Sequence, residues 1–438
     1  MQKVLSGLWI VLSCLLAACS ASKNTARIAD DKIPAAEKYR LEIGALAQNA
    51  AIEQAFQEIE RLEPQTHSDL ILLTEIPSPP FKEEKRARKF SEMLEAAGAD
   101  SVWIDAAGNV LALRRGTAGN RTVALDGHLD TVFPEGTDVR VKTRGDTLFA
   151  PGVGDDTRGL MVVLTVLRAL EKANIQTQAD VLLVGTVGEE GLGDLRGVKH
   201  LFENNAPKID AWIAVDGGGL ARLVNQALGS HRYRITFRGP GGHSWGAFGL
   251  ANPQHALGRA IHYFALSAEK FTASGPRTSF SVGRIGGGTS INAIPFDAWM
   301  EVDMRSVSIA RLQGIDDLLQ QAVQRALREE NAVRRDGPAL TVEVKMVGDR
   351  PSGALDPSLP LIQRAIAATQ HFGTEPSLGT GSTDSNIPIS LGIPAVTIGR
   401  GGQGSGGHSL HEWWLNKDGH LAIQRALLML VAEAGLGE

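Results

Sequence analysis

Imidazole and carboxylate side chains recur in five short polar segments that are separated by long apolar runs. The residues concerned are His128 with Asp130, Asp155 with Asp156, Glu189 with Glu190, Asp216, and His408. Nitrogen and oxygen donors of this kind suit zinc, cobalt or manganese. The two cysteines of the chain, Cys14 and Cys19, both precede these segments, so thiolate chemistry is excluded from the rest of the chain. The set predicts a site for two divalent ions that share a carboxylate and a water.

Each segment alone has a simpler interpretation. Asp155 and Asp156 stand among glycines directly before an apolar helical run, where a carboxylate caps a helix and is favoured by the helix dipole. A pair such as Glu189 and Glu190 is usually solvated charge, and Asp216 before three glycines is usually a turn residue. The ordered set favours the metal site over these separate interpretations.

Neighbouring side chains diverge, so Glu189 and Glu190 are not expected to share one task. One of them can bind a metal while the other faces a water as general base. Asp130, two residues after His128, is placed to accept the other N–H of that imidazole and so to orient it.

Apolar strands precede most of these segments, and helical patterns follow them. The runs at 122–126, 181–187 and 212–215 end just before His128, Glu189 and Asp216. Strands that alternate with helices and are almost wholly apolar predict an α/β fold, with a mostly parallel sheet covered by helices on both faces. Ligands of such sheets bind beyond the carboxyl ends of the strands, where these residues would meet.

Two breaks divide this α/β pattern. Residues 37–227 form the first part of a catalytic domain, in which 37–63 is expected to be one long helix. Residues 228–349 follow the order β-α-β-β-α-β of a ferredoxin-like module, which is expected to be inserted into that domain. Residues 350–438 return to the α/β pattern and complete the catalytic domain. No phosphate-binding glycine loop occurs.

The first 19 residues have the pattern of an export signal, with an apolar run that ends in Leu-Ala-Ala before Cys19. This ending resembles the lipobox of bacterial lipoproteins, which implies cleavage before Cys19, lipidation of Cys19 and anchoring in the bacterial envelope. Residues 20–36 would then be a tether. An ordinary cleaved signal peptide with a chance cysteine is the alternative.

The net charge of −5, with acidic and basic residues interspersed, shows no basic stripe along the sequence. Nucleic acid is therefore not an expected partner.

The ordered motifs resemble those of the M20 co-catalytic metallopeptidases, a zinc-exopeptidase-like family, from about residue 65 to the end. The matching motifs are Gly127-His128-Leu129-Asp130, Gly154-Asp155-Asp156-Thr157-Arg158-Gly159, Gly188-Glu189-Glu190-Gly191, Val215-Asp216-Gly217 and Gly407-His408-Ser409. By these matches His128 and Asp216 would bind one metal, Glu190 and His408 the other, and Asp155 would bridge them, with a cis peptide after it. Asp130 would orient His128, and Glu189 would be the base. His411 is a rival of His408.

The inserted module carries further resemblances. The loop Gly241-Gly242-His243-Ser244 is similar to one that, in dimeric relatives, reaches into the partner's site and stabilises the oxyanion. Asn292 and Arg305 resemble groups that hold the substrate, the arginine through a carboxylate. In the catalytic domain, Thr383 lies in a loop similar to the family's substrate loop. His243 as a turn cap, and Arg305 as a partner of Asp303 or Glu301, are the structural alternatives.

The resemblance implies a homodimeric di-metal exopeptidase that hydrolyses di- or tripeptides through a metal-bridged hydroxide. Zinc is the expected metal, with cobalt or manganese as alternatives. An N-acyl amino acid deacylase with the same site is a second hypothesis. A non-catalytic peptide-binding lipoprotein is a third, and the complete set of ligands and base argues against it.

Overall fold

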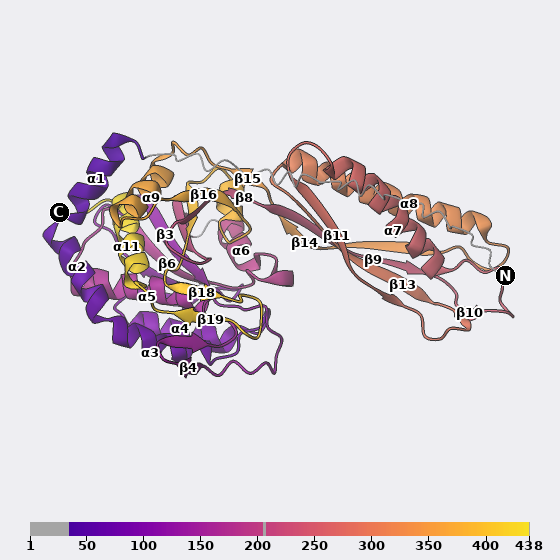
Figure 1. The fold of residues 1–438 in the computed structure, drawn as a ribbon, viewed down its shortest axis with the longest axis horizontal. Coiled ribbons are helices and arrows are strands. Elements are labelled where there is room, and N and C mark those ends of the chain that lie inside the picture. Colours follow the sequence, from indigo (N-terminus) through magenta and orange to yellow (C-terminus); the bar gives the residue numbers. More distant parts are fainter. Residues whose placement is uncertain (1–34, 205–206, 438) are drawn as a thin grey trace, which may run out of the picture. The chain divides into compact units, whose positions relative to one another are not determined.

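The computed structural model describes residues 35–204 and 207–437, and a mixed sheet forms the core of its α/β part (Figure 1). Within these residues the sheet has nine strands, and four neighbours at its centre, β6, β3, β7 and β17, run parallel. The strands, from one edge to the other, are β1 (Ser101–Ile104), β2 (Val110–Arg114), β6 (Asp180–Thr186), β3 (Thr122–His128), β7 (Ala211–Val215), β17 (Ala395–Ile398), β8 (Arg222–Ala227) and β15 (Gly353–Ala354), with β16 (Ser377–Gly381) also paired to β8. The predicted α/β fold is confirmed.

The burial of the central strands shows that both faces of the sheet are covered. Every residue of β7 and β17 is buried, and so is every residue of β3 and β6 after the first. Because successive side chains of a strand point to opposite faces, such strands need packing on both sides. Helix α5 (Thr157–Lys172) packs on β3 and β6, and α11 (His420–Ala434) also packs on β3.

The described residues of the α/β part include eight further helical segments. They are α1 (Glu37–Ala47), α2 (Ala50–Arg61), α3 (Glu63–Thr74), α4 (Glu84–Ala96), the 3-10 turn η1 (Gly191–Gly193), α6 (Arg196–Asn204), α9 (Pro360–His371) and α10 (Asn386–Ser390). The single helix expected over 37–63 is wrong, because the chain breaks after Ala47. The side chain of Asn49 there accepts a hydrogen bond from the Ala51 amide and starts a new helix.

A small antiparallel sheet lies beside the ligand-bearing loops. It joins a hairpin, β4 (Lys142–Arg144) with β5 (Thr147–Phe149), to β18 (Gln403–Ser405) and β19 (Trp413–Leu415). The pairing of β5 with β19 places the segment before Asp155 next to the segment after His408. Two loops that are about 250 residues apart in the sequence are thereby held together.

The inserted module is an antiparallel sheet of order β11-β13-β9-β14 with two helices on one face (Figure 1). Its elements are β9 (Gly229–Arg238), β10 (Gly242–His243), α7 (Pro253–Thr272), β11 (Thr278–Gly287), β12 (Ala293–Ile294), β13 (Asp297–Ser306), α8 (Ile309–Val333) and β14 (Thr341–Arg350). Burial alternates strictly along β13, as expected when helices cover only one face. The strand order is that of a ferredoxin-like fold, as predicted from the sequence.

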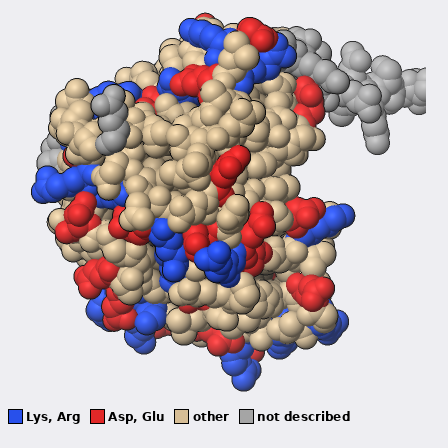
Figure 2. Space-filling model, turned by 90° about the vertical axis from the view of Figure 1, so that its left-hand side faces the viewer, with Lys and Arg blue, Asp and Glu red and all other residues tan. Residues whose placement is uncertain are grey.

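The predicted signal peptide, Cys19 and nearly all of the tether lie outside the described residues, so lipidation and export stay predictions. Among the described residues, no helix combines the length and the apolar character needed to cross a bilayer. On the face drawn in Figure 2, acidic and basic side chains are interspersed among uncharged ones.

Candidate metal centre

The carboxyl ends of two parallel strands bring the first group of predicted ligands together. His128 is the last residue of β3, and Asp216 follows the last residue of β7. With Asp155, which precedes α5, they offer donor atoms that all lie within 4.8 Å of one another. The Nε2 atom of His128 lies 3.4 Å from Oδ1 of Asp155. One imidazole and two carboxylates therefore face a common point.

A second group shares Asp155 with the first. Asp155, Glu190 and His408 also offer donors within 4.8 Å of one another. The Nε2 atom of His408 lies 3.3 Å from Oδ2 of Asp155 and 3.0 Å from Oε1 of Glu190. The two oxygens of Asp155 thus face different imidazoles. Among the described residues, His411 belongs to no such group, so the geometry favours His408 over its rival.

Glu189 lies beside both groups and contacts a cation that comes from the inserted module. Its carboxylate is within 4.8 Å of donor atoms of His128 and Glu190. Arg350, the last residue of β14, donates from Nη1 to Oε1 of Glu189 at 3.0 Å and also donates to its backbone carbonyl. Burial raises the pKa of Glu189 well above its usual range, against the opposing charge of Arg350. A raised pKa suits a carboxylate that must take up a proton near neutral pH.

Asp130 contacts His128 through its backbone carbonyl, and not through its carboxylate as expected from the sequence. Nδ1 of His128 lies 2.9 Å from the backbone carbonyl oxygen of Asp130 and 3.7 Å from its carboxylate. The carbonyl can therefore accept the Nδ1 proton and leave Nε2 free for a metal. The Asp130 carboxylate instead accepts hydrogen bonds from the amides of Glu189 and Glu190, at 3.0 and 2.9 Å. Asp130 thus links the histidine to the paired glutamates.

Asp156 does not cap α5. Its side chain makes no capping hydrogen bond, and its Oδ2 accepts from the backbone amide of His128 at 3.2 Å. The peptide bond between Asp155 and Asp156 is cis, as the resemblance implied. A Cβ atom at Gly159 would lie 2.1 Å from Oδ2 of Asp156, so this position requires glycine. Asp156 is buried beneath His128 and belongs to neither group of donors.

Two charged residues that the sequence did not single out support Asp155. The buried carboxylate of Glu412 accepts hydrogen bonds from the amides of Gly152, Gly154 and Asp155, at 2.6, 3.0 and 2.8 Å. Arg400, two residues after β17, places Nη1 3.3 Å from Oδ1 of Asp155. Arg400 follows an apolar strand, as the ligands do, but a guanidinium cation is not a metal donor, so the pattern of donors does not include it.

The surroundings of Asp155 and His408 shift the pKa values of both groups in opposite directions. Although burial opposes ionisation, hydrogen bonds from His128 and His408 and the charge of Arg400 hold the pKa of Asp155 well below its usual range. Hydrogen bonds to Asp155 and Glu190 raise the pKa of His408 to about 10. A metal ion must displace the proton from such an imidazole, so metal binding would release protons and strengthen as the pH rises.

In the inserted module, the structure brings His243 and Asn292 side by side. They come from β10 and the residue before β12, which pair, and the Ser244 amide donates to the Asn292 carbonyl at 2.9 Å. Nδ1 of His243 accepts from the amides of Trp245 and Gly246, both at 3.2 Å. The proton of a neutral imidazole is then on Nε2, and the side chain is exposed.

Arg305 and Thr383 are both engaged within the protein. Nε of Arg305 donates to Asp303 at 2.8 Å, which is the pairing that the structural alternative proposed. Asp303 also accepts a hydrogen bond from Arg232. The Nη1 atom of Arg232 in turn donates to the Gly191 carbonyl at 2.6 Å, so these hydrogen bonds connect Arg305 to the loop after Glu190.

Thr383 is buried, and its hydroxyl lies 2.7 Å from that of Thr397. This position does not favour contact with a substrate.

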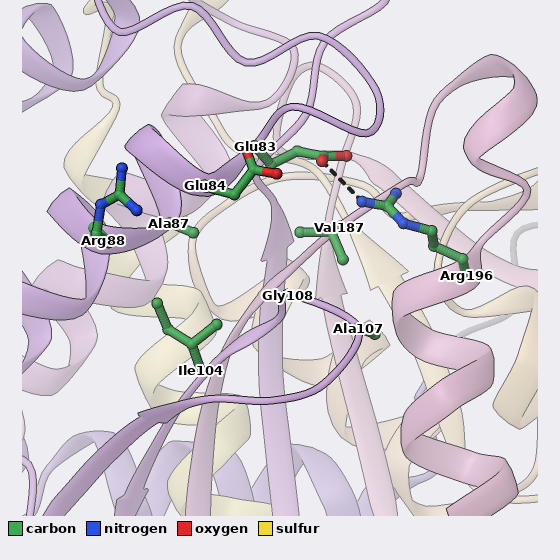
Figure 3. A pocket seen from close by; sticks show the side chains of 9 residues that line it. All are labelled: Glu83, Glu84, Ala87, Arg88, Ile104, Ala107, Gly108, Val187 and Arg196. Carbon is green, nitrogen blue, oxygen red and sulfur yellow. Dashed lines mark hydrogen bonds and ion pairs between the residues drawn. The ribbon is translucent and has the colours of Figure 1, made fainter.

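A separate hollow of about 190 Å³ lies near the start of α4 (Figure 3). Figure 3 shows the ion pair at its rim, in which Arg196 donates to Glu83 at 2.8 Å. None of the predicted ligands lines this hollow, and we place the candidate centre at the two donor groups instead.

Comparison with known proteins identifies the family. The model of peptidase family M20/M25/M40 matches residues 124–433, a range that contains all five predicted ligands and Glu189. The chain belongs to this family. As a member of M20 it is a hydrolase that acts on peptide or amide bonds.

Individual relatives are distant. The chain is 24% identical to carboxypeptidase G2 of Pseudomonas sp. over 336 residues, which cover 73% of this chain and 75% of the relative. It is 25% identical to the succinyl-diaminopimelate desuccinylase of Corynebacterium glutamicum, over 75% of this chain and 86% of that one. A tripeptidase from Staphylococcus aureus shares the fold with a TM-score of 0.67 at 21% identity, over 85% of this chain and 99% of that one.

M20 enzymes depend on metals, and the donors of this chain fit that requirement. Three carboxylates and two imidazoles form the two groups, with one carboxylate common to both. Such hard and intermediate donors suit zinc, cobalt or manganese.

Proposed function

We propose that the protein is a di-metal exopeptidase of short peptides, and that His128, Asp155, Asp216, Glu190 and His408 hold its two metal ions. The observation that carries the proposal is the position of Asp155, whose two oxygens face His128 on one side and His408 on the other. A single carboxylate in that position serves two ions. Zinc is the metal that we expect.

Bound ions of this kind polarise a carbonyl and make a water more acidic. Glu189 takes one proton from the attacking water, whose oxygen forms a bond to the scissile carbonyl carbon. The C–N bond then breaks, and Glu189 returns the proton to the leaving nitrogen. Arg350 holds Oε1 of Glu189 at 3.0 Å, so Oε2 is the oxygen left for the water.

The exposed imidazole of His243 suits a hydrogen-bond donor to the oxyanion that forms during this attack. Its Nε2 carries the proton because its Nδ1 accepts hydrogen bonds from two amides, so the imidazole needs no change of tautomer to donate.

Large apolar side chains around β10 and β12 are exposed as well, by 87% at Trp245, 72% at Phe248 and 61% at Phe296. Such a patch is typical of a protein interface. We therefore propose a homodimer in which His243 serves the partner's centre.

Subunit mixing tests this role of His243. Neither the His243→Ala protein nor the Glu189→Gln protein should turn over substrate well alone. A mixed dimer would contain one centre with an intact Glu189 and an intact His243 from the other subunit. We expect the mixture to regain up to about one quarter of wild-type activity per chain, because half of the dimers are mixed and each has one working centre.

The His262→Ala protein, which loses another exposed histidine of the inserted module, is the matched control and should keep its activity without mixing. Full activity of a monomeric wild-type protein would contradict the dimer proposal. So would a lack of recovery in mixtures in which exchange of subunits is verified.

A substrate panel tests the proposed function itself. Zinc-loaded protein would be assayed with dipeptides, tripeptides, longer peptides and N-acyl amino acids. We expect turnover of di- and tripeptides, in keeping with the tripeptidase that shares this fold. Turnover confined to N-acyl amino acids would favour the deacylase alternative. The predicted signal and Cys19 would place this activity in the bacterial envelope.

A further inference from the structure

A basic groove adjoins the candidate centre and takes no part in the proposed chemistry. It has a volume of about 570 Å³ and lies between the β4–β5 hairpin and the segment after His408. Its lining includes three cations, a histidine and two apolar side chains: Arg140, Lys142, Arg144, His411, Phe149 and Leu410. We call this set the basic groove.

The cations of the basic groove are not all neutralised. Arg140 is paired with Asp138, the one acidic residue of the lining, through two contacts of 2.8 Å. Lys142 and Arg144 are exposed, and no carboxylate of a described residue lies within ion-pair distance of either. Arg144 lies over the ring of Phe149, 5.4 Å from its centre, which holds the guanidinium at the wall. Two cations of one hollow that form no ion pair with a described residue favour an anionic ligand.

The walls of the basic groove are continuous with the loops that carry the ligands. Pro151 of the lining is four residues before Asp155, and His411 is three residues after His408. Glu412 joins the two loops, because its carboxylate accepts the amide of Asp155 and its carbonyl accepts the amide of Ala150. The basic groove and the metal centre are therefore joined by hydrogen bonds through Glu412.

The spacing limits how far a bound anion can be from the scissile bond. At ~3.8 Å between consecutive Cα atoms, His411 lies within about 11 Å of His408, and Pro151 within about 15 Å of Asp155. An extended peptide advances by about 3.3–3.6 Å per residue. These distances are upper limits, and they apply to the wall of the basic groove that Pro151 and His411 form. A substrate held at the centre would thus reach this wall with a group at most three or four residues from the scissile carbonyl.

We propose that the basic groove binds a carboxylate of the substrate, which makes short acidic peptides the preferred substrate class. This inference rests on the proposed function. The carboxylate can be a Glu or Asp side chain or the C-terminus, which share one chemistry. The carboxylate meets Lys142 and Arg144, and Phe149 and Leu410 contact the aliphatic part of the peptide.

Binding to zinc-loaded Glu189→Gln protein separates this inference from the proposed function, because it needs no turnover. Calorimetry would compare alanine tetrapeptides that carry Glu or Gln at each position, with a free or an amidated C-terminus. We expect one acidic peptide to bind about tenfold more tightly than its neutral partner. The preference should weaken as salt is added. A preference for Glu over Gln would identify a side chain as the source of the carboxylate, and a preference for the free over the amidated peptides would identify the C-terminus.

The added substitutions Lys142→Ala and Arg144→Ala should remove this preference and leave the binding of the neutral peptides unchanged. Arg115→Ala with Lys345→Ala, which removes two exposed cations outside the groove, is the matched control and should keep the preference. The inference is overturned if no acidic peptide binds more tightly than its neutral partner. It is equally overturned if the preference survives the loss of Lys142 and Arg144. Failure of the wild-type protein to cleave any peptide would instead reject the proposed function.

Discussion

Replacement of Glu189 by Gln should reduce kcat by about 10²- to 10⁴-fold, the usual contribution of a general base, while two metal ions stay bound per chain. The amide keeps the shape of the side chain, and its oxygen can still accept the hydrogen bond that Arg350 donates at 3.0 Å. It cannot take up the proton of the attacking water. The measurement is steady-state kinetics combined with metal analysis by mass spectrometry on the same samples.

The position of Glu189 makes the metal count decisive. Its carboxylate also lies within 4.8 Å of donors of His128 and Glu190, so the geometry alone would allow it to be a ligand. If the Gln variant loses one ion together with activity, Glu189 is a ligand and the assignment of the base is wrong. Glu95→Gln, on the exposed surface of α4, is the matched control and should change neither quantity.

Replacement of Asp155 by Ala should remove both metals and abolish activity. Two divalent cations about 4 Å apart repel each other four times as strongly as a pair of unit charges, which amounts to about 16 kcal/mol at an effective dielectric constant of 20. A carboxylate between them offsets part of this repulsion and supplies a ligand to each. Without it, the ions lose a shared anion as well as a donor.

The loss of metal from the Asp155→Ala protein can be compared with the loss from variants of residues that belong to only one of the two donor groups. Asp216→Ala should weaken mainly the ion beside His128, and His408→Ala the ion beside Glu190, so each should keep about one ion at moderate metal concentration. Isothermal titration of metal-free protein would measure this. Loss of a single ion from the Asp155→Ala protein would show that Asp155 is an ordinary ligand of one metal.

The sheet and its ligand-bearing edge were predictable because each depends on a local pattern. Apolar strands that end directly before His128 and Asp216 place both residues at the same edge once the strands are known to be parallel. The inserted module was predictable for the same reason, from the alternation of apolar and polar residues along β13 and from the order β-α-β-β-α-β of its elements.

Contacts between distant segments could not be predicted in this way. Glu412 holds the amide of Asp155 across 257 positions of sequence, and Arg350 reaches Glu189 across 161. No periodicity links such pairs, and an arginine does not belong to any pattern of metal donors. The orientation of His128 was predicted with the correct residue but the wrong atom, since the carbonyl of Asp130 is nearer than its carboxylate. Spacing along a chain does not determine which oxygen of a residue turns inward.

The location of two zinc ions by anomalous scattering from crystals of the zinc-loaded protein tests the central claim most directly. We expect two peaks per chain, one beside His128 and Asp216 and one beside Glu190 and His408. Each should lie about 2.0–2.2 Å from a different oxygen of Asp155. A single peak, or two peaks of which only one contacts Asp155, would contradict the shared-carboxylate centre and the function proposed from it.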